Sequence, residues 1–147
     1  MTVQLIIFAL GKIAKINPMN STAYAEIGGI YGFELNKYKE GIKYFKKAIS
    51  ISQDNYDSHF NLGLLYSLDG QRDNAIKEYL TTININPKDP EAYNWLGKEY
   101  VKLSKHRQAM EAFEAAVRFA PNYFRARLNL GKAKKLLGDS KGAILEF

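Results

Sequence analysis

The sequence predicts an all-α protein in which antiparallel helix pairs stack side by side as a solenoid. Three observations predict this fold. Leu-Gly pairs recur at one constant interval, at Gly63, Gly97 and Gly131. Proline follows the first two of these glycines at a constant spacing, at Pro87 and Pro121. Each glycine is also followed at fixed spacings by an alanine and an aromatic residue: Ala75, Ala109, Ala143 and Tyr79, Phe113, Phe147. The interval matches the period of about 34 residues that is typical of arrays in which each repeat is one helix pair.

Each repeat is expected to contain two helices joined by a short turn. In residues 56–68, the first helix of one repeat, a single helical face carries His59, Leu62, Gly63 and Tyr66. After a turn at Asp69-Gly70, the face of the second helix carries Ala75, Ile76, Tyr79, Leu80 and Ile83. Pro87 ends that helix because proline has no amide donor, and Asp89-Pro90-Glu91 supplies the cap and first turn of the next.

The residue sizes at the repeated positions indicate how the helices pack. Glycine and alanine stand where antiparallel helices must approach closely, and larger aromatic residues are expected to fill the wider gaps: Tyr66, Tyr79, Tyr100 and Phe113. A single helix pair cannot bury both of its faces. The pairs are therefore expected to stack on one another.

The period divides the chain into five segments. Residues 1–20 are expected to form the second helix of an incomplete preceding repeat. Four repeats follow at 21–55, 56–89, 90–123 and 124–147, the last truncated in its second helix, for about eight helices in all. The first repeat fits two registers, so an extra residue with a bulge or longer turn is expected between Gly28 and Lys37.

The two ends of the array leave two alternatives open. Repeat arrays need polar capping helices for solubility, and neither end of this sequence provides one. The chain is then either a piece of a longer array, which we favour, or a protein whose terminal helices stack on other copies.

The spacing of these residues closely resembles the tetratricopeptide repeat (TPR). In the third copy the residues that carry the resemblance are Tyr93, Leu96-Gly97, Tyr100, Ala109, Phe113, Ala116 and Pro121. The departures from the pattern are Gln53, His59, Thr82, Arg127 and Lys134. The resemblance implies a right-handed superhelical solenoid, in which the first helices of successive repeats line a concave groove that holds a peptide or a partner helix.

By this resemblance and by helical spacing, the groove face lies opposite the packing stripe of each first helix. The candidate groove residues are Phe60, Asn61, Leu64, Asn94, Trp95, Lys98, Lys102, Arg125, Leu128, Asn129, Lys132 and Lys135, with Asp57, Leu68 and Glu91 on the same faces. The early part of this face is apolar and the late part is basic. Trp95 has two interpretations, because it either faces the groove, as Tyr93 already fills the aromatic packing position, or leans on the neighbouring repeat as core.

The predicted function is a non-catalytic protein–protein interaction module or scaffold. A basic groove with apolar anchors suits a protein or peptide partner that combines apolar and acidic residues. Asn61 and Asn129 are expected to hydrogen-bond the backbone of such a peptide. The lysine and asparagine pattern by which chaperone-binding members grip a C-terminal carboxylate is matched only by Arg125, so that role is disfavoured.

The sequence disfavours several other functions. It contains no P-loop, dinucleotide fingerprint, His-Glu-x-x-His or Gly-x-Ser-x-Gly motif, and no cysteine, so neither an enzyme nor a cofactor or metal is expected. His59 and His106 are interpreted as structural. An isoelectric point of about 9.4 suggests RNA binding as another function. The chain lacks an RNP-type motif, so a nucleic-acid partner is disfavoured.

Three further interpretations concern the whole protein and its location. A self-assembling scaffold and the repeat segment of a larger enzyme remain alternatives to the interaction module. The longest apolar run, residues 5–10, is too short to span a membrane. The absence of cysteine suits both cytosol and periplasm, and a cytoplasmic location is favoured.

Overall fold

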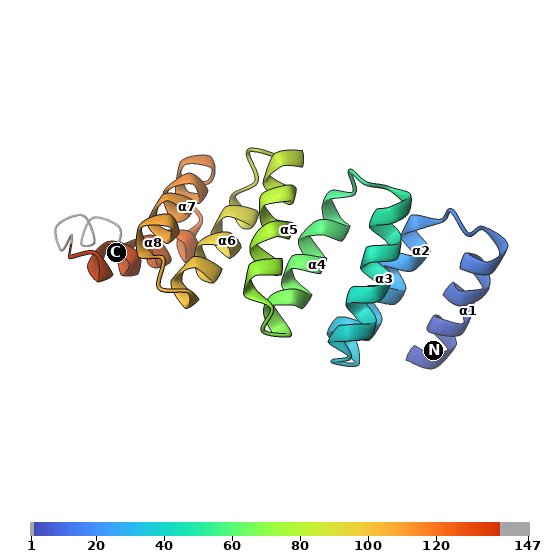
Figure 1. The fold of residues 1–147 in the computed structure, drawn as a ribbon. Coiled ribbons are helices and arrows are strands. Elements are labelled where there is room, and N and C mark those ends of the chain that lie inside the picture. The colour runs from blue at the N-terminus through green and yellow to red at the C-terminus, as the bar shows by residue number, and fades with distance from the viewer. Residues whose placement is uncertain (1, 139–147) are drawn as a thin grey trace. The chain divides into compact units, whose positions relative to one another are not determined.

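The computed structural model describes residues 2–138 and is all-α in this range, as predicted. The α-helices are labelled in Figure 1, and the element order also includes one π-helical segment, η1. Their bounds are α1 Val3–Ile16, α2 Ser21–Gly29, η1 Ile30–Glu34, α3 Tyr38–Ile51, α4 Tyr56–Leu68, α5 Arg72–Ile85, α6 Pro90–Lys102, α7 His106–Phe119 and α8 Phe124–Leu136. The helix expected at residues 56–68 is confirmed as α4. Ala143 and Phe147, which helped to define the period, lie outside the described residues.

The chain divides into two compact units, residues 1–78 and 79–147, with the boundary inside α5. In the first unit α1, α2, α3 and α4 follow one another, and each packs against the next (Figure 1). In the second unit α6 packs against α7 and α7 against α8. None of the helices described is long and apolar enough to cross a membrane.

The core of each unit depends on helices that approach at small residues. In the second unit, Phe113 of α7 lies directly over Gly97 of α6, where an added Cβ would stand 2.5 Å from the Phe113 ring. In the first unit, Gly41 of α3 leaves room for Leu65 of α4, whose Cδ1 would lie 2.7 Å from such a Cβ. Phe113 and Leu65 are buried, so these approaches form the centres of the two cores.

The starts of the first helices follow the predicted period. The N-cap residues of α2, α4, α6 and α8 are Asn20, Asn55, Asp89 and Tyr123, so the first interval is one residue longer than the other two, which are equal. Asn20, Asn55 and Asp89 accept hydrogen bonds from backbone amides two or three residues ahead. The predicted cap at Asp89, with Pro90 in the first turn, is confirmed.

The turns inside the repeats follow the same period without the extra residue. Residues with positive φ stand at equal intervals along the chain, at Asn36, Gly70, Ser104 and Gly138. The extra residue of the first repeat therefore lies between Asn20 and Asn36, and the π-helix η1 occupies this interval. A π-helical turn accommodates one more residue than an α-helical turn, which confirms the bulge expected there.

Adding a side chain at Gly97, beneath the Phe113 ring, is expected to destabilise the second unit. Gly97→Ala is expected to lower the free energy of unfolding by about 1–3 kcal/mol, and Gly97→Leu to prevent folding, because the Phe113 ring must move. Gly11→Ala is the matched control, since an added Cβ there meets nothing within 4 Å, and it is expected to stabilise α1 by about 0.5–1 kcal/mol. Urea unfolding followed by circular dichroism measures both. Equal effects of the two alanines would contradict this packing.

Replacing Ser104, whose backbone lies in the left-handed region, by glycine is expected to stabilise the protein. Ser104 has a φ of 57°, whereas Gly70 and Gly138 hold the equivalent turn positions without the steric cost of a Cβ. Ser104→Gly is therefore expected to raise the free energy of unfolding by about 1 kcal/mol. Gly70→Ala, the reverse change at φ 78°, is expected to lower it by a similar amount. A lower melting temperature for Ser104→Gly would show that the serine side chain stabilises its turn.

Candidate functional site

A cavity of about 210 Å³ opens between α6 and α8 in the second unit. We call it the Trp95 cavity. Six of the predicted groove residues line it, together with Glu91 and Tyr123: Asn94, Trp95, Lys98, Arg125, Leu128 and Asn129. These side chains come together because α6 and α8 begin at equivalent places in successive repeats and present the same face.

A chain of side-chain hydrogen bonds forms one wall of the Trp95 cavity. Asn129 Nδ2 donates to Asn94 Oδ1 at 2.9 Å, and Asn94 Nδ2 donates to the Tyr123 hydroxyl at 3.2 Å. Asn94 is only 3% exposed, so these bonds satisfy an amide that would be costly to bury alone. Burial, with the negative charge of Glu91 second, raises the pKa of Tyr123, which keeps the hydroxyl protonated. The wall is therefore rigid and neutral.

Trp95 and Lys98 form a second pair in the lining of this cavity. The Lys98 Nζ lies 3.4 Å from the centroid of the Trp95 ring, as in a cation–π contact. Burial, followed by the charge of Lys102, lowers the pKa of Lys98. Trp95 is half-buried and lines the cavity. Trp95 thus belongs to the lining of this cavity, and its place on a peptide-binding groove face stays a prediction.

A second cavity of about 300 Å³ adjoins the first and shares Lys98 and Asn129 with it. We call it the Phe113 cavity. Its apolar surface comes from Val101, Phe113, Ala133 and Leu136, and its remaining lining residues are Lys102 and Lys132. Three lysines thus border an apolar floor. This cavity suits an apolar group with negative charge beside it.

Lys102 also has a structural role. Its Nζ lies 2.8 Å from Glu99 Oε1, and Glu99 is 0% exposed. A buried carboxylate needs an opposite charge or hydrogen bonds. Of the three lysines at the Phe113 cavity, Lys102 is therefore the one whose removal would disturb the fold, while the exposed Lys132 has no such role in the geometry described.

The first unit contains a cavity of about 320 Å³ between α2 and α4, which we call the Ser58 cavity. Among its lining residues are Glu26, Asp57, Ser58, Asn61 and Phe33. Of the residues predicted for the groove face in this unit, Asp57 and Asn61 line it. Phe60 stacks instead on Tyr56, with ring centroids 6.2 Å apart, and Leu64 is half-buried outside the lining. The wall of this cavity carries two carboxylates, whereas the sequence predicts an apolar surface here.

The Ser58 and Trp95 cavities occupy equivalent places in the repeat. The two N-cap residues, Asn55 and Tyr123, each line one of them. The other equivalent lining pairs, in the order Ser58 cavity and then Trp95 cavity, are Thr22 and Glu91, Ala25 and Asn94, Glu26 and Trp95, Gly29 and Lys98, Asp57 and Arg125, Asn61 and Asn129. The same backbone position, that of Asp57 and Arg125, thus carries opposite charge in the two units.

Two residues that line these cavities were not predicted as candidate site residues from the sequence, Tyr123 and Phe113. Tyr123 was not predicted, although the sequence contains a signal at its position. Among the first helices described, α8 alone has a tyrosine at the N-cap, where the others have Asn or Asp. Its side chain makes no cap hydrogen bond and instead closes the Trp95 cavity. Phe113 was predicted as core only, yet the ring also forms part of a cavity floor. Lys135 is exposed and lines neither the Trp95 cavity nor the Phe113 cavity.

Both ring nitrogens of His59, the histidine of α4, contact oxygen atoms of neighbouring residues. The His59 Nδ1 lies 2.7 Å from Glu78 Oε2, and its Nε2 lies 2.9 Å from the backbone oxygen of Gln53. Both ring nitrogens are thereby engaged in joining α4 to its neighbours. Within residues 2–138, no group of three or more His, Cys, Asp or Glu side chains could hold a metal ion.

Comparisons with known proteins identify the repeat. A family model described as TPR repeat matches residues 33–70 and 68–104, and one described as tetratricopeptide repeat matches residues 90–123. Anaphase-promoting complex subunit 3 of Schizosaccharomyces pombe is 23% identical over 94% of this chain and 21% of that protein. Photosystem I assembly protein Ycf3 of Synechococcus elongatus is 25% identical over 77% of this chain and 76% of that protein. The chain thus spans about a fifth of the first relative and three quarters of the second.

Solved structures share the fold. A crystal structure of MamA superposes with a TM-score of 0.90 at 25% identity and covers 96% of this chain and 82% of that one. YrrB, a TPR protein with an unusual peptide-binding site, has a TM-score of 0.83 at 22% identity over 98% of this chain and 74% of that one. The first TPR of Spaghetti (RPAP3), bound to an HSP90 peptide, has a TM-score of 0.76 at 24% identity over 80% and 93%. The repeat matches and the shared solenoid fold show that this chain belongs to the tetratricopeptide repeat family.

Proposed function

We propose that this chain is a non-catalytic interaction module that binds a partner peptide through the Trp95 and Phe113 cavities. The partner segment would carry a bulky apolar side chain with acidic residues beside it. The observation that carries the proposal is that two adjoining cavities share Lys98 and Asn129. Amide side chains form one wall of the Trp95 cavity, and apolar side chains form much of the lining of the Phe113 cavity.

Each part of this surface suits one part of a peptide. The apolar floor of the Phe113 cavity would bury the apolar side chain, which gains about 25 cal/mol for each Å² of apolar surface removed from water. Lys98, Lys132 and Arg125 would attract the flanking carboxylates. Asn129 is half-buried and lines both cavities, so its amide suits a peptide backbone, because an amide both donates and accepts, while the buried Asn94 holds Asn129 in place.

The fold supports the same function. YrrB and the first TPR of RPAP3, which share this fold, are described as having a peptide-binding site and a bound peptide, respectively. The cavities here differ chemically from a surface that would grip only a carboxylate, since Trp95 and the Phe113 floor are part of their lining. The expected selectivity is therefore for an apolar group and charge together.

Trp95 is the single tryptophan in the sequence, so its fluorescence reports this site without a label. Titration with synthetic peptides that place leucine or phenylalanine between acidic residues is expected to change the Trp95 emission in a saturable way. Trp95→Ala combined with Lys98→Glu is expected to weaken binding by about 2–4 kcal/mol, because it removes an aromatic anchor and reverses a charge. Fluorescence anisotropy of labelled peptide measures the affinity of this variant, which has no tryptophan.

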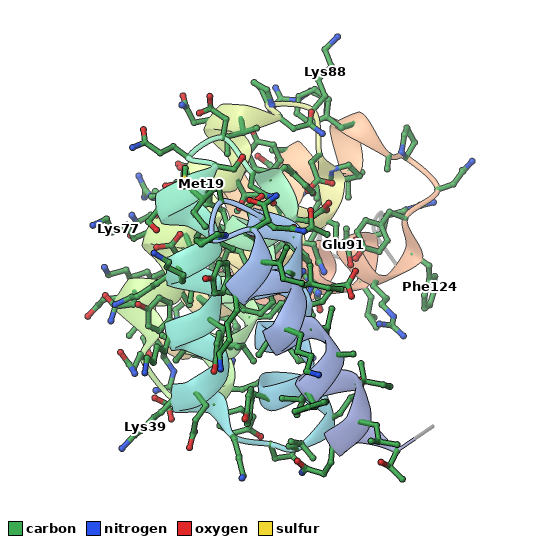
Figure 2. All side chains as sticks on the ribbon, turned by 90° about the vertical axis from the view of Figure 1, so that its right-hand side faces the viewer. Met19, Lys39, Lys77, Lys88, Glu91 and Phe124 are labelled. Atoms are coloured by element: carbon green, nitrogen blue, oxygen red, sulfur yellow. The ribbon has the colours of Figure 1, made fainter. Side chains whose placement is uncertain are left out.

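Two controls make this test specific. Lys88→Glu reverses one charge in the turn before α6, and the Lys88 side chain points away from the molecule (Figure 2). It is expected to leave the affinity unchanged, and both variants to keep the helicity and melting temperature. If the double variant bound the peptide as well as Lys88→Glu does, the groove assignment would be wrong. Equal binding of peptides with lysine in place of the acidic residues would exclude the proposed charge selectivity.

Self-association is a second candidate, supported by an exposed apolar face on α1. Phe8 is 62% exposed and Ile16 is 85% exposed, with Leu5 and Ile13 on the same helix also exposed. If copies of the chain associate through this face, sedimentation across a dilution series should show a concentration-dependent mass that Phe8→Glu abolishes. A monomer at every concentration would exclude this function and leave the peptide-binding proposal intact.

A further inference from the structure

We infer that the Ser58 cavity of the first unit is a second binding site, which takes an arginine side chain of a partner. Its charge is opposite to that of the Trp95 cavity. The two charged residues in its lining are Glu26 of α2 and Asp57 of α4, and neither Lys nor Arg is among the residues that line it.

The carboxylates have no partner of their own. Glu26 and Asp57 are exposed, and neither side-chain carboxylate takes part in a hydrogen bond or ion pair within residues 2–138. Asp57 lies in the first turn of α4, where the helix dipole favours a negative charge, and this accounts for Asp57 alone. Glu26 lies in the middle of α2 and has no such explanation. Two unpaired carboxylates at one cavity provide a site for a cation.

The hydroxyl of Ser58 is the independent observation that points to a ligand. Ser58 is 0% exposed and lines the cavity, and its Oγ has no hydrogen-bond partner among the described residues. A buried hydroxyl without a partner costs free energy. The equivalent positions of the other repeats are Ala23, Ala92 and Ala126, which are all buried. Packing at this position therefore does not require a hydroxyl, and an N–H donor from a ligand would satisfy it.

The shape and the aromatic wall favour arginine over lysine. Phe33 lines the cavity and is 39% exposed, so part of its side chain is available to a ligand. A planar guanidinium stacks on an aromatic ring and presents several N–H donors, which suits two carboxylates and a hydroxyl together. An ammonium group is compact and strongly hydrated, and it matches such a surface less well. With about 320 Å³, the cavity is large enough for one side chain.

The test uses the full chain and a small probe, N-acetyl-arginine amide, followed by ¹⁵N NMR. The expected result is a saturable shift of the backbone amides of Asp57, Ser58 and Asn61, with no shift of the Trp95 indole. N-acetyl-citrulline amide has nearly the same shape without the charge and is expected to cause no saturable shift. Because Trp95 reports the other site, failure here and failure of the proposed peptide-binding function can be told apart.

Charge-neutral variants test the two carboxylates. Asp57→Asn and Glu26→Gln are each expected to weaken arginine binding about twofold to fivefold, as for exposed ion pairs. The double variant is expected to weaken it about tenfold. Asp54→Asn is the matched control, because Asp54 is an exposed carboxylate just before α4 that does not line the cavity. If the double variant binds arginine as Asp54→Asn does, or if citrulline binds equally well, the site assignment is overturned.

Ser58→Ala separates a ligand role of the hydroxyl from a structural one. The variant introduces the residue that the other repeats have at this position, so the melting temperature is expected to stay the same or rise. Arginine binding is expected to weaken severalfold, because one hydrogen bond to a charged group is lost. A lower melting temperature with unchanged arginine affinity would show that the hydroxyl supports the fold and would overturn its place in the site.

Discussion

The close approach of paired helices at residues with little or no side chain is the constraint on which the rest of the structure depends. Gly97 admits the ring of Phe113, and Gly41 admits the side chain of Leu65. Interiors pack at the density of organic crystals, so one added methyl group at such a point forces its neighbour to move. Because each core is built between the helices of a pair and its neighbours, the remaining face of each first helix is available for other chemistry.

That available face carries different chemistry in the two units. At equivalent positions the first unit has Asp57 and Glu26, whereas the second has Arg125 and Trp95. Since the backbone supplies the same concavity in each case, a few substitutions on the first helices set what each cavity can bind. The proposed peptide site and the proposed arginine site follow from this one geometry, and a partner with both acidic and basic segments would satisfy both.

Polar groups within the second unit hold the wall of the Trp95 cavity in place through their own hydrogen bonds. Asn94 is held between Asn129 and Tyr123, and Lys102 is engaged by the buried Glu99. A wall fixed by its own hydrogen bonds loses little conformational freedom on binding, which favours affinity. Lys98 instead lies on the Trp95 ring, so a ligand carboxylate would compete with that cation–π contact.

The sequence by itself determined the helix pairs and their period, and it predicted six of the residues that line the Trp95 cavity. These follow from local causes, because the caps, the glycine column and the three-to-four residue spacing each act within one repeat. It also indicated the extra residue near Gly28, although not its π-helical form. Only the tertiary structure decided which side chains share a cavity. Tyr123 and Ser58 belong to their cavities because α8 and α4 stand beside α6 and α2, and no local pattern in the sequence records that proximity.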